Sequence, residues 1–209
     1  MVATLNAWAR RVPVWTLYVL GVVPAVWLFW LAATGGLGPD PVRALEHRYG
    51  EIALQLLVAG LAVTPLRRLT GVSLLRFRRA LGLLAFAYVV FHVAVWLGLD
   101  MGGDLGAAWA DVFERPHITV GAVGVALLVP LALTSTDRAL RRMGPQAWRR
   151  LHRLAYGAAL AGAAHYLMLV KTWEPAPLAY LAVILGLLAL RLPTGPMGRA
   201  TSLRAGRPD

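Results

Sequence analysis

The sequence predicts an all-α membrane protein, a bundle of six transmembrane helices with both termini on the inner side. Three observations lead to this fold class. Hydrophobic residues make up 58% of the 209 residues and charged residues only 15%, a balance outside the range of soluble domains. The apolar residues gather in runs of roughly membrane-spanning length. The basic residues gather between alternate runs.

Six apolar segments are candidates to cross a bilayer as helices. A crossing needs about 20 apolar residues, with a usable range of about 17–25. In chain order, the expected spans are Val14–Ala33, Gly50–Leu66, Ala80–Leu99, Ile118–Thr134, Leu151–Val170 and Pro177–Leu190. They form one domain, residues 14–192, between a cytoplasmic N-terminus (residues 1–13) and a cytoplasmic tail (residues 193–209) that we expect to be disordered.

The placement of the arginines predicts the orientation. With the N-terminus inside, 17 of the 21 Lys and Arg residues fall on the inner side and eight of the ten acidic residues on the outer side. Because cytoplasmic loops carry the excess of basic residues, we expect both termini on the cytoplasmic side of the membrane. The basic loops would then face anionic lipid headgroups, so the net charge of +11 does not indicate a nucleic-acid partner.

The chain contains no cysteine. Disulfides, iron–sulfur clusters and covalent haem attachment all need cysteine. These classes of site are therefore excluded.

Three histidines are the candidate site residues: His92, His152 and His165 lie inside or at the edge of expected spans. An ionisable group in hydrocarbon needs a compensating partner, and a neutral imidazole is a common iron ligand. At 1.5 Å per residue, His92 lies about 20 Å and His165 about 26 Å from the inner ends of their spans. Being at similar depth, these two could ligate one iron from opposite sides. The alternative is that they are hydrogen-bonded packing residues or a proton relay.

The role of His152 is less determined, because the same arithmetic puts this residue only about 6 Å from the inner end of its span. The residues at that depth on the third span are Arg78 and Arg79, which cannot ligate iron but can bind a haem propionate or a flavin phosphate. His152 is either a second cofactor-site residue or an interfacial one. His47 and His117 are expected at the solvated outer boundary and are not assigned as ligands.

A stretch of small residues precedes His165. Seven of the eight residues 157–164 are Gly or Ala. Small residues allow close approach to a helix, either by a neighbouring helix or by a flat macrocycle. The adjacent histidine favours the macrocycle.

Short motifs in residues 38–171 resemble, in order and spacing, the MsrQ family of haem-binding membrane subunits, which have ferric-reductase-like transmembrane domains. The matching segments are Gly38-Pro39-Asp40-Pro41-Val42, His47-x-x-Gly50, Thr64-Pro65-Leu66-Arg67-Arg68, Arg78-Arg79-x-Leu81-Gly82-Leu83, Phe86-Ala87-Tyr88, His92, Arg115-Pro116, Gly121, Leu133-Thr134-Ser135, Trp148-x-x-Leu151-His152-x-Leu154-x-Tyr156 and His165-Tyr166.

The resemblance implies a function in electron transfer. It implies haem b on His92 and His165, with His152 a further candidate ligand, and an FMN cofactor. It also implies electrons arriving from the quinone pool or a flavin reductase. Their destination would be a periplasmic molybdenum-dependent subunit that reduces methionine sulfoxide, so this chain would carry no catalytic residues of its own.

Two alternatives stay open at this point. One is a transmembrane reductase that acts directly on ferric iron or oxygen. The other is a transporter or proton-relay protein in which the histidines titrate. Because the chain contains no G-x-G-x-x-G fingerprint, we do not expect it to collect hydride from NADPH itself.

Overall fold

The computed structural model describes residues 1–170 and 174–191, so the expected tail, residues 193–209, lies outside the described residues. The regular structure in the described ranges is helical, as the sequence predicted. The helices are α1 Val2–Arg11, α2 Trp15–Ala33, α3 Pro41–Thr70, α4 Arg78–Val95, α5 Leu105–Glu114, α6 Pro116–Leu133, α7 Asp137–Leu151, α8 Leu154–Leu169 and α9 Pro175–Ala189. A 3-10 turn, η1 Leu75–Phe77, leads into α4, and a π-helical segment, η2 Trp96–Asp100, follows it.

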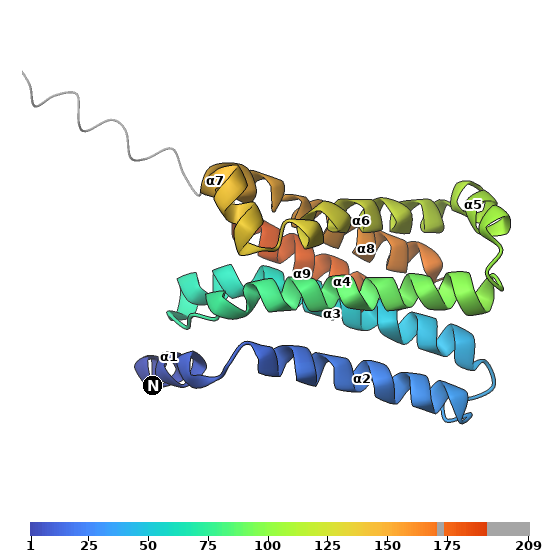
Figure 1. Ribbon diagram of the computed structural model, residues 1–209, viewed down its shortest axis with the longest axis horizontal. Helices are drawn as coiled ribbons and strands as arrows, with labels where there is room; N and C mark the ends of the chain where they lie inside the picture. Colours follow the sequence, from blue (N-terminus) through green and yellow to red (C-terminus); the bar gives the residue numbers. More distant parts are fainter. Residues whose placement is uncertain (171–173, 192–209) are drawn as a thin grey trace, which may run out of the picture.

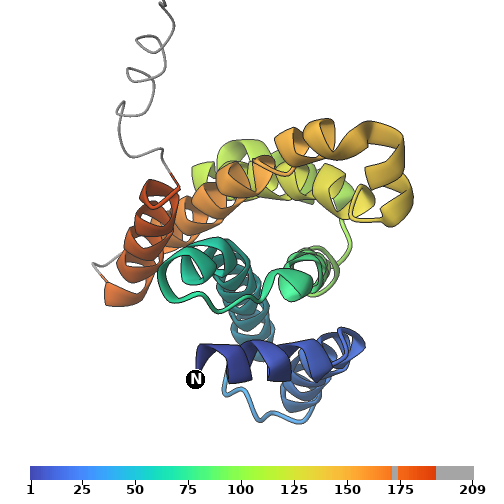
Figure 2. The same cartoon turned by 90° about the vertical axis from the view of Figure 1, so that its left-hand side faces the viewer.

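The long helices run side by side along one axis, and the short ones lie at the two ends. Figure 1 shows α2, α3, α4, α6, α8 and α9 along the length of the molecule, with α1 and α7 at one end and α5 at the other. Figure 2 looks along the bundle from the end that carries α1 and α7, and α1 lies across the bundle there. Short helices α1, α5 and α7 therefore form at the two ends, where the sequence had indicated a cytoplasmic N-terminus and two loops.

Four helical stretches in the described residues are long and apolar enough to cross a membrane. They are Trp15–Ala33, Pro41–Thr70, Leu75–Asp100 and Pro116–Leu133. Helices α8 and α9 are apolar but shorter, with 16 and 15 residues. Both lie alongside the longer helices in the same bundle (Figure 1).

Helix α3 begins nine residues before the expected second span. The Asp40 side chain caps it by accepting a hydrogen bond from the Arg43 backbone N–H at 3.2 Å, and Pro41 occupies the first turn. It ends where Gly71 adopts φ 76°, a left-handed conformation that favours glycine. The charged first turns of α3 carry no hydropathy signal, so the apolar pattern indicated only its later part.

The expected inner loop, residues 136–150, is a helix instead. The Thr136 hydroxyl accepts a hydrogen bond from the Ala139 N–H at 3.1 Å and starts α7. This helix is interrupted at Gly144, with φ 76° and ψ 157°, and it ends at Leu151. The expected fifth span, Leu151–Val170, is therefore not one continuous helix, because His152 and Arg153 form a turn between α7 and α8.

The small residues before His165 allow α8 to pack closely on its neighbours. Ala158, Ala159 and Ala163 are almost completely buried. A Cβ added to Gly124 of α6 would lie 3.5 Å from the Ala161 Cβ of α8, so these two helices meet with little between them. Close helix packing thus explains much of this stretch.

Candidate functional site

A cavity of about 750 Å³ lies between α3, α4, α6 and α8, in the half of the bundle nearer α5. Its interior is lined largely by apolar and glycine residues. Charged groups stand at its rim, among them Arg43, Glu46, Asp100 and Arg115. The volume falls in the usual range for small-molecule and cofactor sites, about 300–1,000 Å³.

His92 from α4 and His165 from α8 both line this cavity. Their ring centres lie 6.1 Å apart, with the ring planes at 80°. Two metal–nitrogen bonds of about 2 Å each, continued to the centres of two imidazole rings, separate the centres by about 6 Å. His92 and His165 were paired in the sequence analysis because of their similar depth in the membrane. Their rings therefore lie at the separation that one shared metal ion requires.

Each of these histidines is held by a backbone carbonyl of a neighbouring helix. The Nδ1 atom of His92 lies 2.9 Å from the Glu46 carbonyl oxygen of α3. The Nδ1 atom of His165 lies 2.6 Å from the His117 carbonyl oxygen of α6. Because a carbonyl only accepts, Nδ1 carries the proton in both rings. The unprotonated Nε2 lone pairs remain available for a metal, and this is the usual outer-shell arrangement of a metal-bound histidine.

A glycine follows each accepting carbonyl by four residues and makes room for the imidazole. A Cβ added to Gly50 would lie 3.2 Å from the His92 Nδ1, and one added to Gly121 would lie 2.9 Å from the His165 Nδ1. Both distances are shorter than an ordinary van der Waals contact. Helices α3 and α6 therefore each present a carbonyl and a glycine, one turn apart, to the histidine beside them.

The donor set matches a macrocycle-bound metal better than a bare ion. In residues 1–170 and 174–191, no group of three or more His, Asp or Glu side chains is placed to hold a metal ion. Two imidazoles alone provide too few ligands for a stable protein-only site. Haem supplies four equatorial nitrogens of its own and needs only the axial ligands from the protein.

Two further histidines, which the sequence placed at the solvated outer boundary without assigning them as ligands, also lie beside this site. His47 and His117 line the same cavity as His92 and His165. The ring centre of His117 is 6.1 Å from that of His165. His47 is exposed and His117 is half-buried, as expected for the outer boundary. The sequence did not indicate that they reach the cavity.

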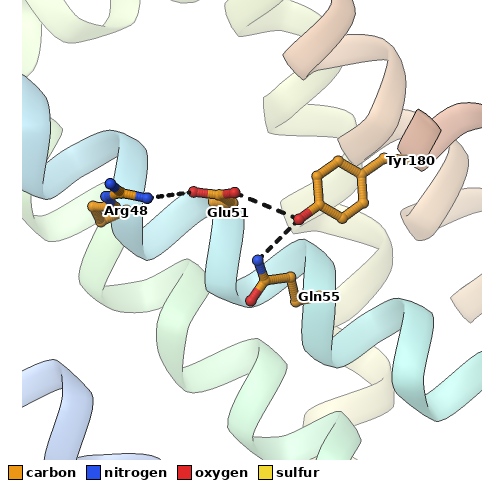
Figure 3. Close-up of polar contacts among 4 residues, drawn as sticks. All are labelled: Arg48, Glu51, Gln55 and Tyr180. Atoms are coloured by element: carbon orange, nitrogen blue, oxygen red, sulfur yellow. Dashed lines mark hydrogen bonds and ion pairs between the residues drawn. The ribbon is translucent and has the colours of Figure 1, made fainter. Parts of the chain in front are cut away.

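A polar network joins α3 to α9 beside the cavity, and the sequence did not reveal it (Figure 3). Arg48 pairs with Glu51 at 3.2 Å, and the Tyr180 hydroxyl lies 3.5 Å from the other Glu51 oxygen. Gln55 donates a hydrogen bond to the Tyr180 hydroxyl oxygen at 2.9 Å. Arg48 and Glu51 also line the cavity, so the network connects its wall to α9.

His152 lies apart from this cavity, at the turn between α7 and α8. Its ring stacks on Trp148 with centres 3.6 Å apart and planes at 22°. Its Nδ1 lies 3.0 Å from the Trp148 carbonyl oxygen, so Nε2 is again the unprotonated nitrogen. That Nε2 atom is buried and has no hydrogen-bond partner in the described part of the chain.

Arg78 and Arg79 lie close to His152 and do not line the cavity. The Arg79 guanidinium pairs with Asp137 of α7 at 2.7 Å. The hydrogen bond and the charge of Arg79 hold the pKa of the Asp137 carboxyl below its usual value. The structure thus separates the five predicted site residues into two groups, one around His92 and His165 and one around His152.

Comparisons with known proteins match this architecture to a family. Residues 48–163 match the family of the ferric reductase like transmembrane component. Proteins described as protein-methionine-sulfoxide reductase heme-binding subunit MsrQ, from Brucella ovis, Brucella canis and Brucella suis, are each 51% identical to this chain over 178 residues. The aligned residues cover 85% of this chain and 80% of each relative.

The chain belongs to the MsrQ family. The resemblance drawn from the sequence motifs is therefore confirmed. As a member with a ferric-reductase-like transmembrane component, the chain is a multi-pass membrane protein. The ferric reductase match begins within α3, includes His92 and His152, and ends two residues before His165.

Proposed function

We propose that this MsrQ-family chain is a cytochrome b subunit that carries electrons across a bacterial inner membrane. Its electrons would pass to a periplasmic, molybdenum-dependent subunit that reduces methionine sulfoxide in oxidised proteins. The relatives are named as heme-binding subunits of protein-methionine-sulfoxide reductase. The observation that carries the proposal is the His92–His165 pair, with ring centres 6.1 Å apart across an apolar cavity.

His92 and His165 would hold the haem through their Nε2 atoms. A haem bound between them supplies an iron that alternates between the ferric and ferrous states and so carries one electron. The carbonyls of Glu46 and His117 hold each ring in the tautomer that presents Nε2. If His92 and His165 both bound the iron, the protein would leave no iron position free for oxygen or substrate, and this would favour electron transfer over direct reductase chemistry.

We further propose six membrane spans, formed by α2, α3, α4, α6, α8 and α9, with both termini in the cytoplasm. At 1.5 Å per residue, α8 and α9 cover about 24 Å and 22 Å, somewhat less than a hydrocarbon core of about 30 Å. Such helices are accommodated by local thinning and by flanking residues that reach the interface. The orientation is supported by the arginines of α1, α7 and the α3–α4 connection, which share one end of the bundle (Figure 1).

A second cofactor site is proposed around His152, nearer the cytoplasmic end. Its buried Nε2 and stacked ring suit a ligand or a cofactor contact. The nearby Arg79 could bind a propionate or the phosphate of FMN. FMN rests on the family resemblance alone. Electrons would enter on this side from a flavin reductase or from the quinone pool.

Reconstitution with the periplasmic reductase subunit tests the proposal against the direct reduction of iron or oxygen. The purified chain is reduced chemically under anaerobic conditions, and its absorbance is followed after the partner and methionine sulfoxide are added. We expect reoxidation that needs both additions and is not reproduced by ferric citrate. Equal reoxidation by ferric citrate or by oxygen without the partner would favour a direct reductase.

A further inference from the structure

A second cluster of polar groups lies at the arginine-rich end of the bundle, where α4 begins and α9 ends. The Arg191 Nη1 donates a hydrogen bond to the Tyr156 hydroxyl oxygen at 2.9 Å, and Arg191 also lies over the Tyr156 ring at 5.1 Å. The Arg191 Nη2 donates to the Leu61 carbonyl oxygen of α3. Arg78 lies beside both Tyr156 and Arg191. We call Arg78, Tyr156 and Arg191 the anion cluster.

The cluster has unused hydrogen-bond donors. The Arg191 Nε is buried and has no partner among residues 1–170 and 174–191. The Tyr156 oxygen accepts from Arg191, and within the same ranges no acceptor receives the Tyr156 hydroxyl proton. Arg78 stays exposed at the surface. Of these groups, the Arg78 guanidinium and the Tyr156 hydroxyl can be reached from outside the chain, and both can donate to an external acceptor.

The cluster also lacks a countercharge. In the described part of the chain, neither Arg78 nor Arg191 forms an ion pair with a carboxylate. Asp137 is the acidic residue at this end in the described ranges, and its carboxylate already pairs with Arg79 at 2.7 Å. Two neighbouring guanidinium groups that are partly removed from water repel each other unless an anion lies near them. The missing partner is therefore anionic.

The surroundings of the cluster are apolar and exposed. Leu69 at the end of α3 is 72% exposed, and Leu185 and Leu190 at the end of α9 are about half exposed. Arg68 bridges these two helix ends by donating to the Leu190 carbonyl oxygen at 3.5 Å. Basic pockets between transmembrane helices on the cytoplasmic side are typical sites for anionic lipid headgroups. An acyl chain of such a lipid would lie against the exposed leucines.

We propose that the anion cluster binds the phosphodiester group of one anionic phospholipid. Arg78 and Arg191 neutralise the phosphate, and the exposed Arg78 guanidinium and the Tyr156 hydroxyl donate hydrogen bonds to its oxygens. The bound lipid would bridge α3, α4, α8 and α9 at this end of the bundle. This occupant differs from the cofactor phosphate or propionate predicted for Arg78 from the sequence. The inference rests on the membrane orientation proposed above, but it does not require haem.

Native mass spectrometry of the purified full chain tests this proposal. The protein in neutral detergent is titrated with phosphatidylglycerol, with phosphatidylcholine of the same acyl chains, and with inorganic phosphate. We expect one retained phosphatidylglycerol per chain, and no comparable retention of phosphatidylcholine. Arg78→Gln and Arg191→Gln should each weaken retention about fivefold, since one arginine near a lipid surface contributes about 1 kcal/mol.

Matched variants keep the test decisive. Tyr156→Phe removes the hydroxyl, both as a donor to the lipid and as the acceptor for Arg191 Nη1, and leaves both arginines in place. It should weaken retention and does not depend on the folding of the arginine variants. Arg142→Gln, on the exposed surface of α7, and Tyr18→Phe, on α2, should bind as the wild type does. Equal retention of phosphatidylcholine, displacement of the lipid by inorganic phosphate, or unchanged binding by Arg191→Gln and Tyr156→Phe would each overturn the proposal.

The same samples separate this inference from the proposed function. Their absorbance spectra report haem directly. Lipid retention without haem would contradict the cytochrome proposal alone. A loss of haem or flavin in Arg78→Gln or Arg191→Gln with lipid binding unchanged would instead assign the cluster to a cofactor and overturn the lipid site.

Discussion

His92 and His165 are held by the same local arrangement on two different helices. In each case a backbone carbonyl accepts from Nδ1, and a glycine four residues later leaves space for the ring. The sequence could predict the two histidines from their depth in the membrane. It could not predict Gly50 and Gly121, because the importance of a small residue depends on which helix face meets the histidine.

The first prediction concerns Gly121. In Gly121→Ala, the new Cβ would lie 2.9 Å from the His165 Nδ1, so the imidazole must shift away from the His117 carbonyl. Disturbing such an outer-shell contact typically weakens binding of the metal group about 10- to 100-fold. We expect Gly121→Ala to lose most of its haem during purification, measured as haem per chain.

Gly82→Ala is the matched control, because a Cβ there would meet nothing within 4 Å. It should retain haem as the wild type does. If both variants keep the wild-type amount of haem per chain, the close approach at Gly121 does not position His165.

At the scale of the element, the long apolar runs indicated the apolar parts of the helices and missed their polar extensions. The first span matches α2 closely, whereas the polar start of α3 and the arginine-rich α7 were expected as loops. Hydropathy reports transfer into lipid, and these segments are helical because of caps at Asp40 and Thr136. The missed turn after Leu151 changed the environment assigned to His152.

The second prediction concerns the interruption in α7. Gly144 adopts φ 76° and ψ 157°, a region that other residues enter at a cost of about 1–3 kcal/mol. Gly144→Ala should therefore lower the midpoint of thermal unfolding by a few degrees. The midpoint is measured by heating samples and following the loss of the native, non-aggregated peak in size-exclusion chromatography.

The comparison is Gly186→Ala in α9, where the glycine is helical and a Cβ would have open space. Alanine is the better helix former there, so that variant should be unchanged or slightly more stable. A Gly144→Ala protein as stable as Gly186→Ala would show that the interruption is not needed.

At the scale of the whole molecule, the two ends of the bundle differ in charge and in role. The arginine-rich end carries α1, α7 and the anion cluster, and the other end carries α5 and the cavity with the His92–His165 pair. Electrons that cross from the first end to the second would move outward under the proposed orientation. The charge asymmetry was visible in the sequence, but the position of the cavity required the packing of four helices.

The third prediction tests this orientation. Because the chain contains no cysteine, a thiol reagent can label only the cysteine that is introduced. Single-cysteine variants at exposed positions are treated in spheroplasts with a thiol reagent that does not cross membranes. Arg43→Cys and Leu105→Cys should be labelled directly. Arg11→Cys and Arg142→Cys should be labelled only after the membrane is permeabilised. The opposite pattern would reverse the orientation.

The central claim is that His92 and His165 hold one haem between them, and a spectrum tests it most directly. Wild type, His92→Ala, His165→Ala and His117→Ala are purified, and haem per chain is measured with the reduced-minus-oxidised spectrum. We predict the sharp bands of a six-coordinate b cytochrome in the wild type and in His117→Ala, and the loss of one haem equivalent in each of the other two variants. Unchanged haem content in both His92→Ala and His165→Ala would contradict the account.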